Sequence, residues 1–547
     1  MAYLAASLVM LYPISNVLHL ASASYPGDAR LNIWTLAWVN HVWESQGLSL
    51  FDANIYHPAK GTLAYSEHLV GIAPFSFPIY AATHNPTLAY NIVWFVAFVL
   101  NGLMAHLLLF RVTRNHLAAL AGGTAYAFSF FNMLHGHGHL QLVWSFWMPL
   151  SVIAIDRWAA RPSWVRAITV AAVLVMQMLA SWYLAVLVLL LAAAYVPFAA
   201  FLHRPTRHTI GRLAVQSLAI ACVLLLCVAP FVRHYVGFPP GSIAEAAGFS
   251  ADFASYLVPP QGTWLGLSWP SWMPDQPREP YRESTLFVGY IRLVLFGIGL
   301  LWVLGKGPGP APDRTMRATG AFAVFLVVAG GWLSFGPGRD VLGLPSLYDV
   351  FVTLPGMTLI RAPGRFALLV SLGMAIGSAI GALAVLRRWP NATRYVVLLL
   401  ILGLSETYFV HFPGGRPQPE AIPKVYEFLR DLGPGAVVSL PSHRGLPWDW
   451  RDADYQYFST VHWRPIVNGY SRREPDGYSS VAKLMAAFPG HESATAMRSM
   501  GVGFVVVHTE HYEGGALGLI EKAEASPDFA LVARDGPQML FAVRPGR

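Results

Sequence analysis

The sequence predicts a mainly α-helical, multi-pass membrane domain followed by a small C-terminal α/β domain. Three observations support this fold class. The 547 residues are 55% hydrophobic and only 12% charged, with a mean hydropathy of +0.46, whereas about a quarter of the residues in soluble globular proteins are charged. Long apolar runs recur up to residue 412. From Pro413 onward, β-rich and helix-like segments alternate over a normal domain length.

Apolar runs of membrane-spanning length recur eleven times before the C-terminal domain. A transmembrane helix needs about 20 mostly apolar residues, within a range of about 17–25. The first run lacks the positive segment that begins a signal peptide, so we interpret it as a span. The predicted spans are 2–22, 88–110, 117–134, 140–156, 167–181, 183–202, 213–232, 286–305, 318–336, 362–386 and 395–412.

The charge distribution predicts how these spans are oriented. Up to residue 412 the chain has 23 Lys and Arg against 14 Asp and Glu, and from Pro413 onward it has 14 against 15. Much of the basic excess lies in short loops, which the positive-inside rule places in the cytoplasm. We therefore expect a cytoplasmic N-terminus and no nucleic-acid patch. The basic loops are 111–116, 156–166, 203–212, 306–317 and 387–394.

This topology predicts two domains. Residues 1–412 form the transmembrane domain, and its large outer loops are 23–87, 233–285 and 337–361. Residues 413–547 form a soluble α/β domain on the outer side, after a linker at 411–423 that is rich in helix breakers. Its expected strands are 436–441, 466–469, 503–508 and 539–543, and its expected helices are 424–432, 479–488, 493–500 and 515–525.

Asp28 stands at the start of the first outer loop, in "PGDARLNIWTLAW". Leu31, Trp34 and Trp38 follow at helical spacing, which predicts an amphipathic helix on the membrane surface with its tryptophans at headgroup depth. An aspartate directly before a helix is typical of an N-cap that accepts backbone N–H bonds. A carboxylate at the boundary of water and lipid is also suited to act as a general base toward a hydroxyl group. The two roles are compatible.

Other polar residues of the same loop are candidates to line a substrate pocket. Asn32 lies on the predicted helix behind Asp28, and Glu67 and His68 are adjacent in "AYSEHLVGIAPFSFP". The adjacent pair is either an ordinary polar pair of a loop or faces the same cavity as Asp28.

Three alternating histidines, His135, His137 and His139, occur in "NMLHGHGHLQ" between the third and fourth predicted spans. Imidazole is a common metal ligand, and residues two apart point to one side of an extended segment. No cysteine or aspartate accompanies them nearby, which favours a polar hairpin over a metal site. Donation to a substrate phosphate is a third interpretation. We assign no residue as a metal ligand.

Two pairs of charged residues lie in the later outer loops or at their boundary with a span. Glu245 and Asp252 are about two helical turns apart in "SIAEAAGFSADF", so they share a face if one helix includes both. They are then either a second carboxylate group or ordinary solvated residues. Arg361 and Arg365, in "LIRAPGRF", are four residues apart at the outer membrane boundary. Because arginine is disfavoured on that side, we interpret them as a clamp for a lipid phosphate, the alternative being headgroup anchoring.

In the C-terminal domain, "VHWRPIVNGYS" brings together His462, Asn468 and Tyr470. These side chains either contact a sugar through hydrogen bonds and aromatic stacking or lie in a strand and turn of the domain core. The sequence contains no P-loop, no dinucleotide-binding glycine fingerprint, and no HExxH or GxSxG motif. Nucleotide-driven transport is therefore not expected.

The chain has an acidic residue, Asp28, in a large first outer loop and an odd number of spans before an outer C-terminal domain. In these features it resembles the GT-C superfamily of integral-membrane glycosyltransferases, and more closely a bacterial branch of that superfamily. The phrases that support the resemblance are "TAYAFSFFNMLHGHGHLQLVWSFWMPL", "FSADFASYLVPP", "LPGMTLIRAPGRF" and "VHWRPIVNGYS". The resemblance covers nearly the whole chain.

The resemblance implies an inverting hexosyl- or pentosyltransferase that uses a polyprenyl-phosphate-linked sugar. The acceptor would be an envelope glycan, lipid or protein on the outer face of the bacterial inner membrane, with the C-terminal domain in the periplasm. Asp28 would be the general base, and a divalent cation, Mg or Mn, would be an optional cofactor. Many members have two adjacent acids at this point, whereas Ala29 and Arg30 follow Asp28 here.

Two other classes of function remain as alternatives. A non-catalytic transporter or flippase of lipid-linked glycans would need charged residues along a path through the spans. Only Arg292 and Glu406 are clear candidates, and both are near the predicted outer ends. A scaffold protein would act through its C-terminal domain alone.

Overall fold

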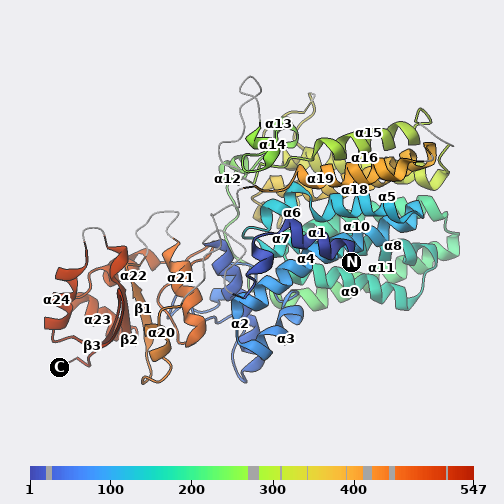
Figure 1. Cartoon of the computed structure of the whole chain (residues 1–547). Coiled ribbons are helices and arrows are strands. Elements are labelled where there is room, and N and C mark those ends of the chain that lie inside the picture. Colours follow the sequence, from blue (N-terminus) through green and yellow to red (C-terminus); the bar gives the residue numbers. More distant parts are fainter. Residues whose placement is uncertain are drawn as a thin grey trace. The chain divides into compact units, whose positions relative to one another are not determined.

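The structure, a computed structural model, describes residues 1–19, 27–268, 283–307, 311–341, 343–389, 391–410, 422–442, 450–512 and 515–546. The predicted linker at 411–423 lies, up to residue 421, outside these residues. The chain divides into two compact units, whose helices and strands are labelled in Figure 1. The first unit is Met1–Asn16 with Val93–Arg416, and the second is Val17–Ile92 with Pro417–Arg547.

The first unit is built from helices. In the described part of the chain, five helices are long and apolar enough to cross a membrane, and three shorter apolar helices accompany them. The chain is therefore a multi-pass membrane protein, while the predicted count of eleven spans and their orientation stay predictions. The long helices are α4 (Pro86–Thr113), α10 (Trp182–His203), α11 (Arg207–Val232), α16 (Arg314–Ser334) and α18 (Ala367–Arg388), which follows the 3-10 turn Pro363–Phe366. The shorter ones are α9 (Trp164–Ala180), α15 (Tyr290–Val303) and α19 (Ala392–Ser405).

Three predicted spans are not single spanning helices. In 2–22 the helix α1 ends at Met10, because Pro13 follows closely, and its nine residues reach only about 14 Å. The third and fourth spans are interrupted by short turns. Their helices are α5 (His116–Ala127), α6 (Phe130–His135), α7 (Leu140–Val143) and α8 (Trp147–Ala160).

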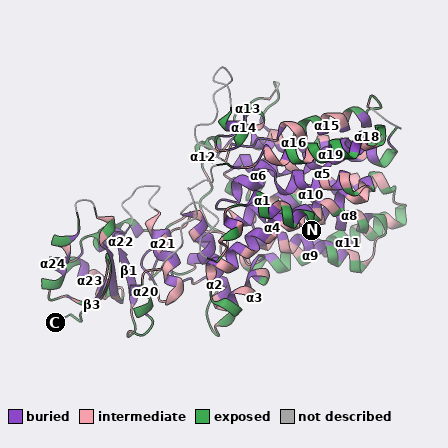
Figure 2. Ribbon diagram, in the orientation of Figure 1, coloured by how far each residue is buried: buried purple, intermediate pink, exposed green. Residues whose placement is uncertain are grey.

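Helix α18 lies at the centre of the first unit and packs against α5, α15 and α16 (Figure 1). Almost all its residues are buried (Figure 2). Small residues allow the close packing: a Cβ added at Gly299 of α15 would lie 2.6 Å from the Gly377 carbonyl oxygen of α18. Membrane helices have no hydrophobic drive toward each other, so such close approach through small residues is a main source of their association.

Helix α11 has the opposite character. Only three of its side chains are buried, and apolar side chains such as Leu218, Leu225 and Leu226 are exposed (Figure 2). In a helix of this length and hydropathy, exposed leucines are the surface expected to face lipid.

The second unit contains a four-stranded sheet of order β1-β2-β4-β3. Strand β1 (Ala436–Leu440) is parallel to β2 (Val502–His508), and the pairs β2/β4 and β3/β4 are antiparallel. The other strands are β3 (Phe529–Asp535) and β4 (Gln538–Val543). The accompanying helices are α20 (Val425–Phe428), α21 (Arg451–Phe458), α22 (Tyr478–Ala486), α23 (His491–Ser499) and α24 (Leu517–Ala525).

Main-chain hydrogen bonds join the loop 23–87, predicted to be the first outer loop, to this sheet. The Val467 N–H donates to the Val437 carbonyl of β1, and the other side of the same segment pairs with residues 54–57. There the Ile466 N–H donates to the Asn54 carbonyl, and the Tyr56 N–H donates to the Asn468 carbonyl. The loop 23–87 thus belongs to the same compact unit as the C-terminal region. The predicted domains instead place the loop in 1–412 and the C-terminal region in 413–547.

Helix α2 (Asp28–Glu44) corrects the prediction of an amphipathic surface helix. Near its end Trp43 is 42% exposed, but Trp34 and Trp38 are inside the second unit, 1% and 3% exposed. Each indole N–H finds a partner there, the Asn54 side-chain oxygen for Trp34 and the Leu50 carbonyl for Trp38. The helix packs against α3 (Ala73–Thr83) and α21, so Trp34 and Trp38 are core residues and not headgroup anchors.

We predict that Gly299→Val destabilises the first unit, because the added methyl groups would clash with the α18 backbone. Overpacking of this kind costs about 1–3 kcal/mol. The matched control is Gly297→Val on the same helix, since a Cβ at Gly297 meets no atom within 4 Å. Thermal unfolding in detergent should give a lower midpoint for the first variant and an unchanged midpoint for the second. Equal midpoints would contradict the close packing of α15 on α18.

Candidate functional site

In the second unit, Asp28 is the first residue of α2, and the N-cap position is Gly27. The N-cap predicted at Asp28 is therefore at Gly27, one residue earlier. The Asp28 side chain is half-buried, and the Tyr470 hydroxyl donates to its Oδ1 at 3.1 Å. The structure thus brings together two of the residues that the sequence singles out, although they are 442 positions apart.

Acidic residues of α21, which were not among the predicted site residues, lie next to the same helix. The Arg30 Nε is 3.3 Å from Asp454 Oδ1, and the Arg30 guanidinium also lies over the Tyr457 ring. Asp452 is buried and accepts from Asn468. The spacing "DAD" at 452–454 is visible in the sequence, but only the packing of α21 on α2 indicates its relevance.

The other candidates of the first outer loop have local roles. The Asn32 side chain is buried and donates to the Asp28 main-chain carbonyl one turn earlier. His68 is buried against the edge of Phe51, its Nδ1 accepts from the Val70 N–H, and burial lowers its pKa to about 3. Glu67 is half-buried beside it.

Asn468 lies in the core of the second unit, and His462 is half-buried next to Tyr426. Asn468 is 1% exposed, and its side chain exchanges hydrogen bonds with the Ser439 main chain of β1 as well as donating to Asp452. His462 stacks on Tyr426, accepts from the Arg464 N–H, and has its pKa lowered to about 3 by burial. Both side chains therefore have structural partners, and the core interpretation fits them better than sugar contact.

In the first unit, Arg365 forms a buried ion pair with Glu283, which was not among the predicted site residues. Its Nε donates to the Glu283 carboxylate at 3.1 Å, and its guanidinium lies 4.0 Å from the centre of the Tyr183 ring. Burial opposes ionisation of Glu283, but the Arg365 charge and His135 hold the pKa of this carboxyl well below its usual range. Glu283 is the last acid before the eighth predicted span, which is the only signal the sequence gives.

Arg361 forms a second and more accessible ion pair with Glu245. Its guanidinium also lies over the Phe249 ring. The expected sharing of a face by Glu245 and Asp252 is wrong, because α12 (Ile243–Gly248) ends between them. Asp252 instead caps α13 (Phe253–Leu257) by accepting from the Ser255 N–H and hydroxyl.

The two arginines also do not share one helical face. Arg361 precedes the 3-10 turn Pro363–Phe366, Arg365 lies inside it, and α18 begins only at Ala367. Pro363 explains the break, since the residue before a proline is disfavoured in the α region. Each guanidinium nevertheless faces a glutamate of the 233–285 loop, so the two arginines meet that loop and are not merely headgroup anchors.

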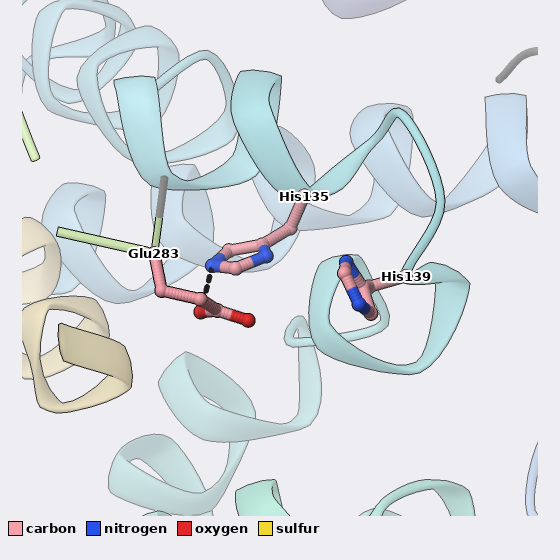
Figure 3. A group of neighbouring side chains, drawn as sticks. All are labelled: His135, His139 and Glu283. Atoms are coloured by element: carbon pink, nitrogen blue, oxygen red, sulfur yellow. Dashed lines mark ion pairs between the residues drawn. The ribbon is translucent and has the colours of Figure 1, made fainter. Parts of the chain in front are cut away.

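His135 and His139 converge with Glu283, as Figure 3 shows. His135 ends α6, and the His139 N–H donates to its carbonyl, so one helical turn separates the two rings. The segment is therefore not extended, which was the condition for an i, i+2 metal site, and the ring of His137 packs against Phe409. His135 Nε2 is 3.5 Å from Glu283 Oε2, and burial lowers the pKa of His135 to about 3 despite this carboxylate.

The two charges predicted within the spans have structural partners. Glu406 accepts from the Tyr290 and Ile291 N–H groups at the start of α15. Arg292 is buried and donates to the Phe128 and Gly403 carbonyls and to Thr407. Both side chains thus satisfy backbone groups where helices begin or end.

Comparison with known proteins gives one family and several similar structures. A family model described as "Domain of unknown function (DUF6311)" matches residues 36–405. No curated protein matches the sequence. The solved structures include the arabinofuranosyltransferase AftD from Mycobacteria, with a TM-score of 0.57 and 15% identity over 100% of this chain. They also include apo ArnT from Cupriavidus metallidurans, with a TM-score of 0.41 and 13% identity over 99% of this chain and 97% of that one.

The likeness to AftD is one of fold. This chain spans 40% of the length of that protein, at an identity too low to transfer an activity. The shared fold confirms, at the level of fold, the resemblance to GT-C glycosyltransferases that the sequence predicts.

We predict that Glu283→Gln strongly destabilises the first unit, because the buried Arg365 would lose its countercharge. Breaking a buried ion pair in this way costs on the order of 3 kcal/mol. Glu245→Gln is the matched control, since its partner Arg361 is partly exposed and the loss there should stay below about 1 kcal/mol. Thermal unfolding in detergent with a chelator checks both variants. Equal losses would argue against a special role for the buried pair.

We also predict that Asn468→Ala destabilises the second unit, by about 3 kcal/mol, because buried polar groups of Ser439 and Asp452 would lose their partner. Ser480→Ala on the exposed surface of α22 should change the stability by less than about 0.5 kcal/mol. The midpoint of thermal unfolding measures both. An unchanged midpoint for Asn468→Ala would instead favour the sugar-contact interpretation.

Proposed function

Because the chain belongs to the DUF6311 family and has the fold of the GT-C glycosyltransferases, we propose that it is a membrane glycosyltransferase. It moves a sugar from a polyprenyl-phosphate-linked donor to an envelope glycan, lipid or protein on the outer face of the bacterial inner membrane. The observation that supports this most is the fold likeness to AftD, which extends over the whole chain.

In the proposed reaction Asp28 is the general base. Its carboxylate takes the proton of the acceptor hydroxyl, and the hydroxyl oxygen forms a new bond to the anomeric carbon of the sugar. The bond between that carbon and the phosphate oxygen breaks, and polyprenyl phosphate leaves with the bonding electron pair. A single displacement of this kind inverts the configuration at the anomeric carbon.

The surroundings of Asp28 suit this role. The side chain is half-buried, so part of its surface is accessible, and the Tyr470 hydroxyl donates to one carboxylate oxygen and orients it. The nearest cation along α2, Arg30, is paired with Asp454. The place of a second acid next to Asp28 in sequence is taken by Ala29, and Asp454 supplies a carboxylate on the packed helix instead.

We propose that Arg361 and Arg365 contribute to binding of the donor phosphate. Arginine forks match phosphate oxygens and remain charged at every relevant pH. Each arginine has a glutamate partner, so an entering phosphate would share the guanidinium N–H groups with Glu245 or Glu283. The more exposed Arg361 is the easier of the two to reach.

The alternative of a non-catalytic flippase has less support. A polar path for a lipid-linked glycan requires charged side chains that are available to it. Arg292 and Glu406, the two charges that the sequence predicts in the spans, already bind backbone groups at helix ends.

We predict that Asp28→Asn abolishes sugar transfer while the protein keeps its thermal stability, because the amide cannot accept the proton. General-base catalysis contributes typically 10²–10⁴-fold to a rate. Asp431→Asn, an exposed aspartate of the same unit, is the matched control and should keep full activity. The assay follows transfer from polyprenyl-phosphate sugars to membrane acceptors. Full transfer by Asp28→Asn would exclude Asp28 as the base.

A further inference from the structure

Two imidazoles and one carboxylate meet in the first unit at a point where neighbouring ligand atoms can share a cation. One nitrogen each of His135 and His139 and one oxygen of Glu283 all lie within 4.8 Å of one another (Figure 3). His135 belongs to α6, His139 to the turn before α7, and Glu283 to the end of a long outer loop. The cluster therefore joins segments that are far apart in the sequence.

The distance between His135 and Glu283 matches that of two ligands of one ion. Zinc binds imidazole nitrogen and carboxylate oxygen at about 2.0–2.2 Å in tetrahedral geometry, which places neighbouring ligand atoms about 3.4 Å apart. His135 Nε2 and Glu283 Oε2 are 3.5 Å apart. The His139 ring lies edge-on to the His135 ring at 5.4 Å and is less buried, so a small rotation can bring its nitrogen closer.

A buried atom without a hydrogen bond points to the same place. His135 is 2% exposed, and its Nε2 makes no hydrogen bond although it faces the Glu283 carboxylate. Buried polar atoms are nearly always satisfied, and an exception often marks an ion or water that completes the site. Arg365 donates to both oxygens of Glu283, in the way that outer groups orient metal-bound carboxylates.

We propose that His135, His139 and Glu283 bind a divalent cation of the zinc class. Two imidazoles with one carboxylate form a ligand set typical of zinc sites that keep an open position. Magnesium prefers a shell of oxygen ligands, so this set differs from the Mg or Mn that the family resemblance implies. His137 does not take part, because its ring packs against Phe409.

A cation here would change the charge of the cluster. Arg361 and Arg365 are balanced by Glu245 and Glu283, so the four charged groups sum to zero. A divalent ion on the histidines and Glu283 makes the cluster positive, which favours an anionic oxygen ligand at the open position. The proposal is independent of sugar transfer, since metal binding is measured without any substrate.

The test uses the purified full-length chain in detergent, stripped with a chelator and titrated with Co²⁺ as a spectroscopic probe for the zinc site. We expect one tight ion per chain with the visible absorption of a protein-ligated ion, and displacement of Co²⁺ by Zn²⁺. His139→Gln and His135→Gln should each weaken binding at least tenfold. His137→Gln, the matched control from the same segment, should bind as the native chain does.

A second group in the described part of the chain, His508, Glu510 and His511, has to be distinguished from this site. His511→Gln serves for that purpose and should leave the tight ion in place. Where His135→Gln fails to give a monodisperse protein, the partly exposed His139 decides the test alone. The proposal is overturned by the absence of tight binding, by native affinity in His139→Gln, or by loss of the ion in His511→Gln only.

Discussion

The main-chain pairing of residues 54–57 with residues 466–468 determines how the second unit is built. Backbone N–H and C=O groups need partners when they are buried, and here each segment supplies them to the other across more than 400 positions of sequence. Gly469 allows this approach, because a side chain there would collide with the Tyr56 ring. The pairing brings α2 to α21 and places Asp28 within reach of the Tyr470 hydroxyl. The proposed base is therefore held by tertiary structure and not by its own loop.

The first unit depends on a different constraint, the need to satisfy every polar group inside apolar helices. Small residues bring α15 onto α18, while Glu406 and Arg292 bind the backbone groups left open at helix ends. Against this background, the Arg365–Glu283 pair with its two histidines is distinctive. It gathers two charges and two imidazoles where a loop meets helix ends, and a polar cluster of that kind in a membrane protein is a candidate for function.

Composition and the length of hydrophobic runs predict a mainly helical membrane protein, since run length reflects membrane thickness directly. The strands 436–441, 503–508 and 539–543 also match β1, β2 and β4 closely, whereas the exposed, weakly apolar β3 gave no usable pattern. The surface location of Trp34 and Trp38 was mispredicted because a helical apolar stripe looks the same whether it covers lipid or protein. The partners of Asp28 and Arg365 could not be predicted, because Tyr470 and Glu283 reach them only through long-range packing.

The proposed sugar transfer breaks the sugar–phosphate bond of the donor, whereas transport leaves that bond intact. The decisive measurement incubates the purified chain in lipid vesicles with polyprenyl-phosphate sugars and membrane acceptors, and follows the lipid product by mass spectrometry. The account predicts release of free polyprenyl phosphate in equal amount to glycosylated acceptor. Movement of the donor across the vesicle membrane with its sugar–phosphate bond intact would contradict it.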